Sequence, residues 1–346
     1  MNMHNSTSTE LSPFAEDVLR GLSSIPKELS SKYFYDDEGS RLFQEIMKLP
    51  EYYLTGCEQE IFSTQAPEIF LAFSESSKMR GDAKANETLS VSQDISFDLI
   101  ELGAGDGTKT AVLIKHFLSQ NADIHYSPID ISQEALDALT KRFDREFPAL
   151  RMVAKNGDYF KILDSLKIIG GRRKVLLFLG SNIGNFNREQ AVDFFRSLRG
   201  VMSDDDLIFI GFDLQKDPHV IVPAYDDEAG VTAAFNLNLL KRINRELGGD
   251  FDIEQFTHYA NYRPVEGSAR SFLISRQQQS VHIKALDKTF EFEPWEAVFM
   301  EISQKFSVRM IHEIAAESGF EVKQNFFDTK KYYCDSLWRT SPNRER

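Results

Sequence analysis

Three glycines at alternate positions are the residues of this 346-residue chain whose spacing most directly predicts chemistry. Gly103, Gly105 and Gly107 follow an apolar run and precede a segment of helical periodicity that ends near Leu118. Glycine lets a backbone turn sharply and approach a ligand closely, and a helix that starts behind such a turn presents unpaired N–H groups. The turn therefore suggests a nucleotide-type ligand, although a tight turn in any α/β protein could contain the same three glycines.

Acidic residues near the turn separate the kinds of ligand. A dinucleotide fingerprint needs a third glycine five positions after the first, where this chain has Thr108. The observed spacing, with Glu101 two residues before Gly103, is typical instead of S-adenosylmethionine sites. Asp130 ends the next predicted strand, where a carboxylate can accept bonds from both ribose hydroxyls. Asp158 and Tyr159 follow the third, where they can contact the adenine amino group and cover its ring. A methyl donor is favoured over a nicotinamide cofactor or no nucleotide.

Motifs for other chemistries are absent from the sequence. It contains no GxxxxGK[ST] phosphate loop, no HExxH and no pair of histidines at ligand spacing, so we expect no metal. The serine of LGSNIG follows a predicted strand but lacks the GxSxG context of a hydrolase. The same segment stands where amino-methylating nucleic-acid enzymes carry (N/D)PP(Y/F/W).

Composition and charge restrict the partners. A formal net charge of −13 disfavours binding to nucleic acid or to an anionic membrane and suits a small cationic or zwitterionic ligand. The sequence has no run of 18 apolar residues, and its first residues resemble no secretory signal. Cys57 and Cys334 lack CxxC spacing and suit a reducing compartment, where both would be packing residues. We expect a cytoplasmic monomer.

Short apolar segments alternate with helical patterns through the middle of the chain. Predicted strands lie at 97–102, 124–130, 151–154, 174–180 and 207–212, with helices at 108–118, 133–147 and 188–201. Strands that are almost entirely apolar and are separated by helices indicate a parallel sheet covered on both faces. The predicted fold class is therefore α/β.

The alternation stops after Asp213. A long helix is predicted at 231–247, followed by β-like runs at 254–262, 268–276, 280–286 and 289–292 that indicate an antiparallel insert. A helix at 307–318 and strands at 320–327 and 334–339 are expected to return to the first sheet.

The segment before the first strand is less regular. Helical spacing is present at 10–22 and 41–48, and Pro50 is expected to end the second helix and leave Tyr52 and Tyr53 extended. Residues 74–96 are polar and aperiodic, which indicates an exposed loop without a function of its own.

Several longer segments together resemble one family, the histidine-specific Nα-methyltransferases of ergothioneine biosynthesis. The matching segments are KYFYDDEGSRLFQEIMKLPEYYLT, ELGAGDGTKT, YSPIDIS, FLGSNIGNF, DLQKDP, AYDDEAGVTAAFNLNLLKRINRELGGDFD and MEISQKF. The resemblance implies a Rossmann-like methyltransferase sheet with an inserted α+β substrate-binding domain. We therefore predict a flexible lead at 1–25, an S-adenosylmethionine domain at 26–213 and 306–346, and a substrate domain at 214–305.

The resemblance also implies roles for individual residues. Those implied to line the methyl-donor pocket are Gly103, Gly105, Lys109, Asp130, Asp158 and Tyr159, the last in place of the family's usual phenylalanine. Those implied to hold the amino and carboxylate ends of the substrate are Tyr52, Asn185, Tyr225 and Thr232. Glu301 and Ser303 would bind the imidazole, and Tyr35 would lie beside the substrate.

The residue types suit these roles. Asn185 and the hydroxyls supply donors and acceptors for an amino acid, and Glu301 can accept from an imidazole N–H while Ser303 serves the other nitrogen in either tautomer. Judged singly, the same residues suit packing or an exposed strand, and Asp226 and Asp227 are better explained as a turn or helix cap than as metal ligands. The joint occurrence favours a histidine site.

Two positions depart from the family pattern. Ser271, beside Phe272, stands where some members carry a methionine near the imidazole, and Asn182 stands where threonine is common. Related fungal enzymes methylate a prenylated tryptophan, so another aromatic amino acid is an alternative substrate, although Glu301 argues against an indole. A non-catalytic binding protein on the same scaffold is a further alternative.

The expected reaction is transfer of the methyl group from S-adenosylmethionine to the neutral α-amino nitrogen of L-histidine, repeated to give the trimethyl betaine, hercynine. Positioning would supply most of the catalysis, since a sulfonium is already an activated donor. Tyr52 and Tyr225 are the candidate catalytic residues, because their hydroxyls could help remove the ammonium proton.

Overall fold

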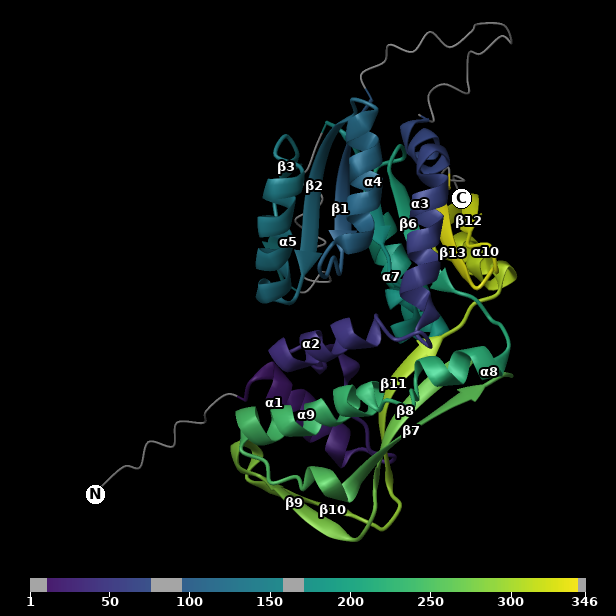
Figure 1. The fold of residues 1–346 in the computed structure, drawn as a ribbon. Coiled ribbons are helices and arrows are strands. Elements are labelled where there is room, and N and C mark those ends of the chain that lie inside the picture. Colours follow the sequence, from purple (N-terminus) through teal and green to yellow (C-terminus); the bar gives the residue numbers. More distant parts are fainter. Residues whose placement is uncertain (1–10, 76–94, 158–170, 342–346) are drawn as a thin grey trace, which may run out of the picture. The chain divides into compact units, whose positions relative to one another are not determined.

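The computed structural model describes residues 11–75, 95–157 and 171–341, and the chain divides into two compact units (Figure 1). We call residues 52–217, 265–268 and 303–346 the sheet unit, and residues 1–51, 218–264 and 269–302 the smaller unit. Across the described ranges, no helix combines the length and apolar character needed to cross a membrane.

The sheet unit is built on one mixed sheet of eight described strands. The strands are β1 (Ser96–Leu102), β2 (Asp123–Asp130), β3 (Arg151–Met152), β4 (Lys155–Asn156), β5 (Arg173–Phe178), β6 (Leu207–Asp213), β12 (Phe320–Phe327) and β13 (Tyr333–Thr340). Their order is β12-β13-β6-β5-β1-β2-β3, with β4 also paired to β2. Strands β1 to β6 pair in parallel, while β13 runs antiparallel to both β6 and β12. The α/β prediction is confirmed, and the last two strands return to this sheet as expected.

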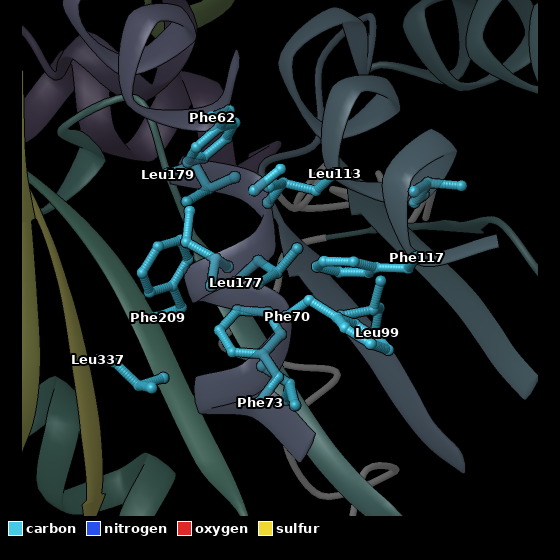
Figure 2. Close-up of a cluster of buried hydrophobic side chains, with 14 of the residues drawn as sticks. Phe62, Phe70, Phe73, Leu99, Leu113, Phe117, Leu177, Leu179, Phe209 and Leu337 are labelled. Carbon is cyan, nitrogen blue, oxygen red and sulfur yellow. The ribbon is translucent and has the colours of Figure 1, made fainter. Parts of the chain in front are cut away.

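Helices cover both faces of this sheet. They are α3 (Tyr53–Ser74), α4 (Thr108–Ser119), α5 (Gln133–Glu146), α7 (Arg188–Arg199) and α10 (Val308–Glu317). Alternate residues of each strand face opposite cores, so Leu99 packs with α3 and α4 while Ile100 packs with α7 and α10. Figure 2 shows the first core, where Phe70 and Phe73 of α3 lie near Leu99 and Phe117. Strands buried on both faces explain the uninterrupted apolar runs of the sequence.

One edge of the sheet gathers the residues predicted to bind ligands. Parallel strands end at the same edge, and β1, β2, β5 and β6 are mutually parallel. The glycine turn follows β1, Asp130 ends β2, and Asp213 ends β6. The 3₁₀ helix η3 (Asn182–Asn185) follows β5 at this edge. Open α/β sheets bind their ligands beyond the carboxyl ends of their strands, so this edge is the candidate site.

Helix α3 corrects the expectation of an extended stretch at Tyr52 and Tyr53. Tyr53 is the first residue of a 22-residue helix, and Tyr52 is its N-cap. Its buried face carries the charged Glu58 among apolar residues, and Pro67 lies in its interior, so the segment lacks the local signals of a simple amphipathic helix. Packing on the sheet therefore decides this helix, not a local pattern.

The smaller unit contains three longer helices and five strands among its described residues. The helices are α1 (Pro13–Ser23), α2 (Asp37–Ile46) and α9 (Val231–Leu247). The strands are β7 (Phe256–Arg263), β8 (Ser268–Ser275), β9 (Gln279–Ile283), β10 (Lys288–Phe292) and β11 (Ala297–Gln304), which form a β11-β8-β7 sheet and an antiparallel β9-β10 pair. The four predicted β-like runs are present, and β11 is an additional strand.

The N-terminal helices belong to this unit. Phe34, Tyr35 and Phe43 pack around Phe235 of α9, with ring centroids 4.9, 5.6 and 5.9 Å from it. Asp36 caps α2 and also accepts a hydrogen bond from Asn238, at 2.8 Å from Gly39 N and 2.7 Å from Asn238 Nδ2. This grouping differs from the expected domains, which placed residues 26–51 with the sheet, because these contacts join distant parts of the sequence.

Candidate active site

The backbone of the glycine turn requires its glycines. Gly103, Gly105 and Gly107 have φ values of +75°, +54° and +63°, in the left-handed region that side chains disfavour. A Cβ on Gly105 would meet no described atom within 4 Å, whereas one on Gly107 would lie 2.8 Å from Leu139 Cδ1 of α5. Gly105 therefore leaves space above the turn for a ligand, and Gly107 allows close packing below it.

Asp130 holds the turn from the end of the neighbouring strand. Its Oδ2 accepts a hydrogen bond from Gly105 N at 2.8 Å, and its Oδ1 accepts one from Ser132 N at 2.9 Å. Each carboxylate oxygen has a second lone pair, so both can still accept from the hydroxyls of a ribose. Asp130, which the sequence predicts to bind the ribose, thus also stabilises the glycine turn.

Lys109 is fixed by a buried carboxylate. Its Nζ pairs with Glu58 of α3, which also accepts from Gly180 N at 2.8 Å and from Tyr333 OH at 2.9 Å. A Cβ on Gly180 would lie 3.3 Å from Lys109 Nζ, so the ammonium lies against the turn that follows β5. Sequence reasoning missed Glu58, because it lies on the helix that was not predicted.

Asn182 lies beside the donor turn. Its Nδ2 is 3.1 Å from the position that a Cβ on Gly103 would occupy. Asn182, which stands where threonine is common in the family, therefore lies near the predicted methyl-donor site. The other departure, Ser271, is buried in β8 of the smaller unit.

Glu101, the acid before the glycines, supports the fold beneath the turn. Its side chain is buried and accepts hydrogen bonds from Thr110 Oγ1, at 2.7 Å, and from Tyr126 OH. Burial raises the pKa of the Glu101 carboxyl to about 7, although these two hydroxyls oppose the shift. Glu101 thus ties α4 and β2 to the end of β1.

This raised pKa predicts a pH-dependent stability. Between pH 4.5, the ordinary pKa of a glutamate, and about pH 7, the folded state binds the Glu101 proton more tightly than the unfolded state does. The contribution of this proton to the free energy of unfolding is therefore fully present below pH 4.5 and is lost as the pH rises through about 7. We expect the Tm of Glu101→Gln to rise relative to wild type between about pH 5 and about pH 8 in thermal unfolding. Glu134→Gln, on the exposed face of α5, is the control. A constant difference in Tm would contradict the assigned pKa.

Three predicted substrate residues lie in the sheet unit. Tyr52 is half-buried against the first core, and Asn185 is exposed at the end of η3. Ser303 is buried, and its Oγ lies 3.4 Å from the position that a Cβ on Gly184 would occupy. The structure therefore brings Ser303 and the turn that carries Asn185 together.

Four others lie in the smaller unit: Tyr35, Tyr225, Thr232 and Glu301. Asp227 accepts from Val231 N at 2.8 Å and from Thr232 N at 2.7 Å, which confirms the predicted helix cap. Thr232 Oγ1 is buried and has no hydrogen-bond partner among the described residues. Tyr225 is buried at the end of the 3₁₀ helix η4 (Val222–Ala224), and Glu301 is half-buried on β11.

Two predicted donor residues, Asp158 and Tyr159, lie outside the described residues. Conversely, the structure adds a buried cluster at the end of β6 that sequence reasoning missed. Asp213, Lys216 and Lys305 form ion pairs there, with Lys305 Nζ 2.8 Å from Asp213 Oδ2. The sequence feature that could have indicated this cluster is the charged Lys305, which lies two residues after Ser303 inside the segment MEISQKF.

Comparison with known proteins identifies the family. A family of proteins described as histidine-specific, S-adenosylmethionine-dependent methyltransferases matches residues 14–340. The chain belongs to this family. It is therefore a methyltransferase that uses S-adenosylmethionine, as the glycine turn and Asp130 indicated.

Individual relatives of this methyltransferase agree. It is 36% identical to histidine N-alpha-methyltransferase of Mycobacterium tuberculosis over 303 residues, covering 88% of this chain and 87% of the relative. It is 35% identical to the protein of the same name from Mycolicibacterium smegmatis, with the same coverage. It is 28% identical to ergothioneine biosynthesis protein 1 of Schizosaccharomyces pombe, covering 87% of this chain and 37% of that protein.

Proposed function

We propose that this methyltransferase transfers methyl groups to the α-amino nitrogen of L-histidine. The two mycobacterial relatives are named for this activity. The observation that carries the proposal is the pair Glu301 and Ser303, which are two positions apart on β11 and so point to the same face of the strand. A carboxylate and a hydroxyl at this spacing match the two nitrogens of an imidazole.

The chain's own residues would hold the amino acid and remove its proton. Asn185 and Thr232 supply amide and hydroxyl groups for the carboxylate and the amine. The hydroxyls of Tyr52 and Tyr225 would accept hydrogen bonds from the ammonium and help pass its proton to solvent water, because only the neutral amine has a lone pair. S-adenosylmethionine, when bound, supplies a methyl group on a sulfonium that is already activated for displacement.

The donor half of the site suits this role. The glycine turn leaves space above Gly105, and Asp130 retains lone pairs for the ribose. Asn182 lies beside the glycine turn, and the Lys109 ammonium, held by Glu58 of α3, lies against the turn that follows β5, so polar groups with fixed positions surround the proposed donor site. Such preorganisation lets positioning supply most of the rate enhancement.

Three successive transfers form the finer part of the proposal. Each partly methylated amine keeps a lone pair after losing a proton, so it can rebind and react again. The trimethylammonium product has no N–H to donate to the oxygen of Asn185, which favours its release. The product would then be the betaine hercynine.

Mass spectrometry of the product tests both parts. Purified protein is incubated with L-histidine and methyl-labelled S-adenosylmethionine, and the product is fragmented at several times. The proposal expects labelled mono-, di- and trimethyl species with every label on the α-nitrogen. A label on the imidazole would contradict the site of transfer, and a reaction that stops at the monomethyl species would contradict the repeated transfer.

A second candidate is N-methylation of another aromatic amino acid. The observation that favours it is Ser271, a small buried residue of β8, because it leaves more room than the methionine that the family resemblance implies at this position. Glu301 favours histidine, because an indole has one nitrogen, an N–H that Glu301 could accept, and offers no second nitrogen to Ser303.

A further inference from the structure

Ser303 belongs to a buried charged cluster at the end of β6. Lys305 Nζ lies 2.8 Å from Ser303 Oγ and 2.8 Å from Asp213 Oδ2, and both charged side chains are fully buried. Asp213 also accepts from Tyr53 OH at 2.8 Å and pairs with Lys216. All five residues belong to the sheet unit.

The lysine fixes the direction of the serine hydrogen bond. An ammonium group has three donors and no acceptor, so Ser303 Oγ must accept from Lys305. A hydroxyl has a single hydrogen, and Ser303 must therefore direct it to a different acceptor. Without Lys305, the same hydroxyl could either donate or accept.

We propose that Lys305 is a positioning residue that makes Ser303 a hydrogen-bond donor to the substrate, so that the site selects the neutral imidazole over the imidazolium. This inference rests on the proposed histidine substrate. A neutral imidazole has one N–H and one lone pair, which match an accepting Glu301 and a donating Ser303. An imidazolium has two N–H groups, and one of them would face the hydrogen of Ser303.

The charge of Lys305 also disfavours the imidazolium. The positive charge of Lys305, 2.8 Å from Ser303 Oγ, disfavours a second cation bonded to that hydroxyl. Buried charges interact more strongly than exposed ones, because water screens them less. Asp213 offsets part of this effect and holds the ammonium in place.

Besides Lys216 and Tyr53, the ionisable groups near the cluster among the described residues include Cys57, Tyr332 and Tyr333, and Glu301 lies two positions before Ser303 on β11. Burial lowers the pKa of Lys216, although Asp213 opposes the shift. Burial raises the pKa of the Cys57 thiol to about 12, so this thiol stays neutral near neutral pH. Glu301 favours the imidazolium, and the proposal holds that the Lys305 charge and the fixed direction of the Ser303 hydrogen outweigh it.

Calorimetric titration of the protein with L-histidine tests the inference. In wild type, the Kd is expected to rise about tenfold for each pH unit below about 6.5, because only the neutral imidazole binds. In Lys305→Met, we expect a rise of less than about threefold per pH unit, because Ser303 can then accept from an imidazolium N–H. Lys305→Arg keeps the charge and the donors and should keep the wild-type slope.

Lys216→Met is the matched control. Lys216 donates to Asp213, Tyr53 OH and Leu214 O, so its loss disturbs the same cluster at a different point. We call the change in Kd per pH unit below about 6.5 the acid slope, and the acid slope of Lys216→Met should equal that of wild type. Circular dichroism checks that each variant is folded.

The outcomes separate this inference from the proposed function. If wild type binds no histidine at any pH, the proposed function and the inference both fail. If wild type binds histidine equally well at about pH 5.5 and about pH 7.5, the inference fails by itself, whichever variants fold. Equal acid slopes in wild type and folded Lys305→Met also overturn it while leaving the histidine substrate in place.

Discussion

Replacing Asp130 with alanine is expected to weaken the binding of S-adenosylmethionine about 10- to 100-fold, measured as Kd by calorimetry. The carboxylate accepts from Gly105 N and Ser132 N in the structure and has lone pairs left for the ribose. Its removal leaves two backbone donors without their acceptor and takes away the ribose contacts. The two backbone donors are affected in the free and the bound protein alike, so the loss of affinity comes from the ribose hydrogen bonds, whose removal costs about 1–3 kcal/mol.

Asp144→Ala is the control for this experiment. Asp144 is an exposed aspartate on α5, away from the strand end, so its loss should leave the Kd unchanged. Equal affinity in wild type and Asp130→Ala would remove Asp130 from the donor site. An equal loss in both variants would show a general electrostatic effect of removing one negative charge.

Replacing Glu301 with alanine is expected to lower kcat/KM for L-histidine about 10- to 100-fold. The carboxylate is the proposed acceptor for the imidazole N–H, and its removal leaves that group unpaired in the site. The interaction is made with the bound substrate and its transition state alike, so most of the loss should appear in KM. Steady-state kinetics at saturating methyl donor measures both constants.

Glu254→Ala controls for the removal of a carboxylate from the same unit. Glu254 is exposed in the 3₁₀ helix η5 (Ile253–Gln255). We expect this variant to keep the kinetic constants of wild type. An unchanged kcat/KM in Glu301→Ala would exclude Glu301 from imidazole recognition and weaken the case for histidine.

The sheet could be predicted from the sequence because its strands are apolar and short. The predicted helix at 231–247 and strand at 320–327 have the bounds found in the structure. In both cases local signals define the ends, such as the left-handed Gly248 and Gly319 that border them. The positions of Asp130 and Lys109 near the glycine turn could also be predicted, since strand ends fix them.

Helix α3, strand β11 and the buried cluster could not be predicted in this way. Helix α3 contains Pro67 in its interior, and Glu58 lies among the apolar residues of its buried face. The contact of Asp213 with Lys305 joins residues 92 positions apart, and it depends on the end of β6 meeting the residues just after Gln304, where Phe306 N also donates to Asp213 O at 2.9 Å. The roles of the substrate residues, and those of Asp158 and Tyr159, stay predictions.

A comparison of free amino acids as methyl acceptors tests whether L-histidine is the substrate. Wild-type protein is incubated with methyl-labelled S-adenosylmethionine and each free amino acid separately, and incorporated label is quantified by mass spectrometry. The proposed function predicts that L-histidine gains label at its α-nitrogen far faster than L-tryptophan or any other amino acid. Labelling of another amino acid while histidine stays unmodified would contradict it.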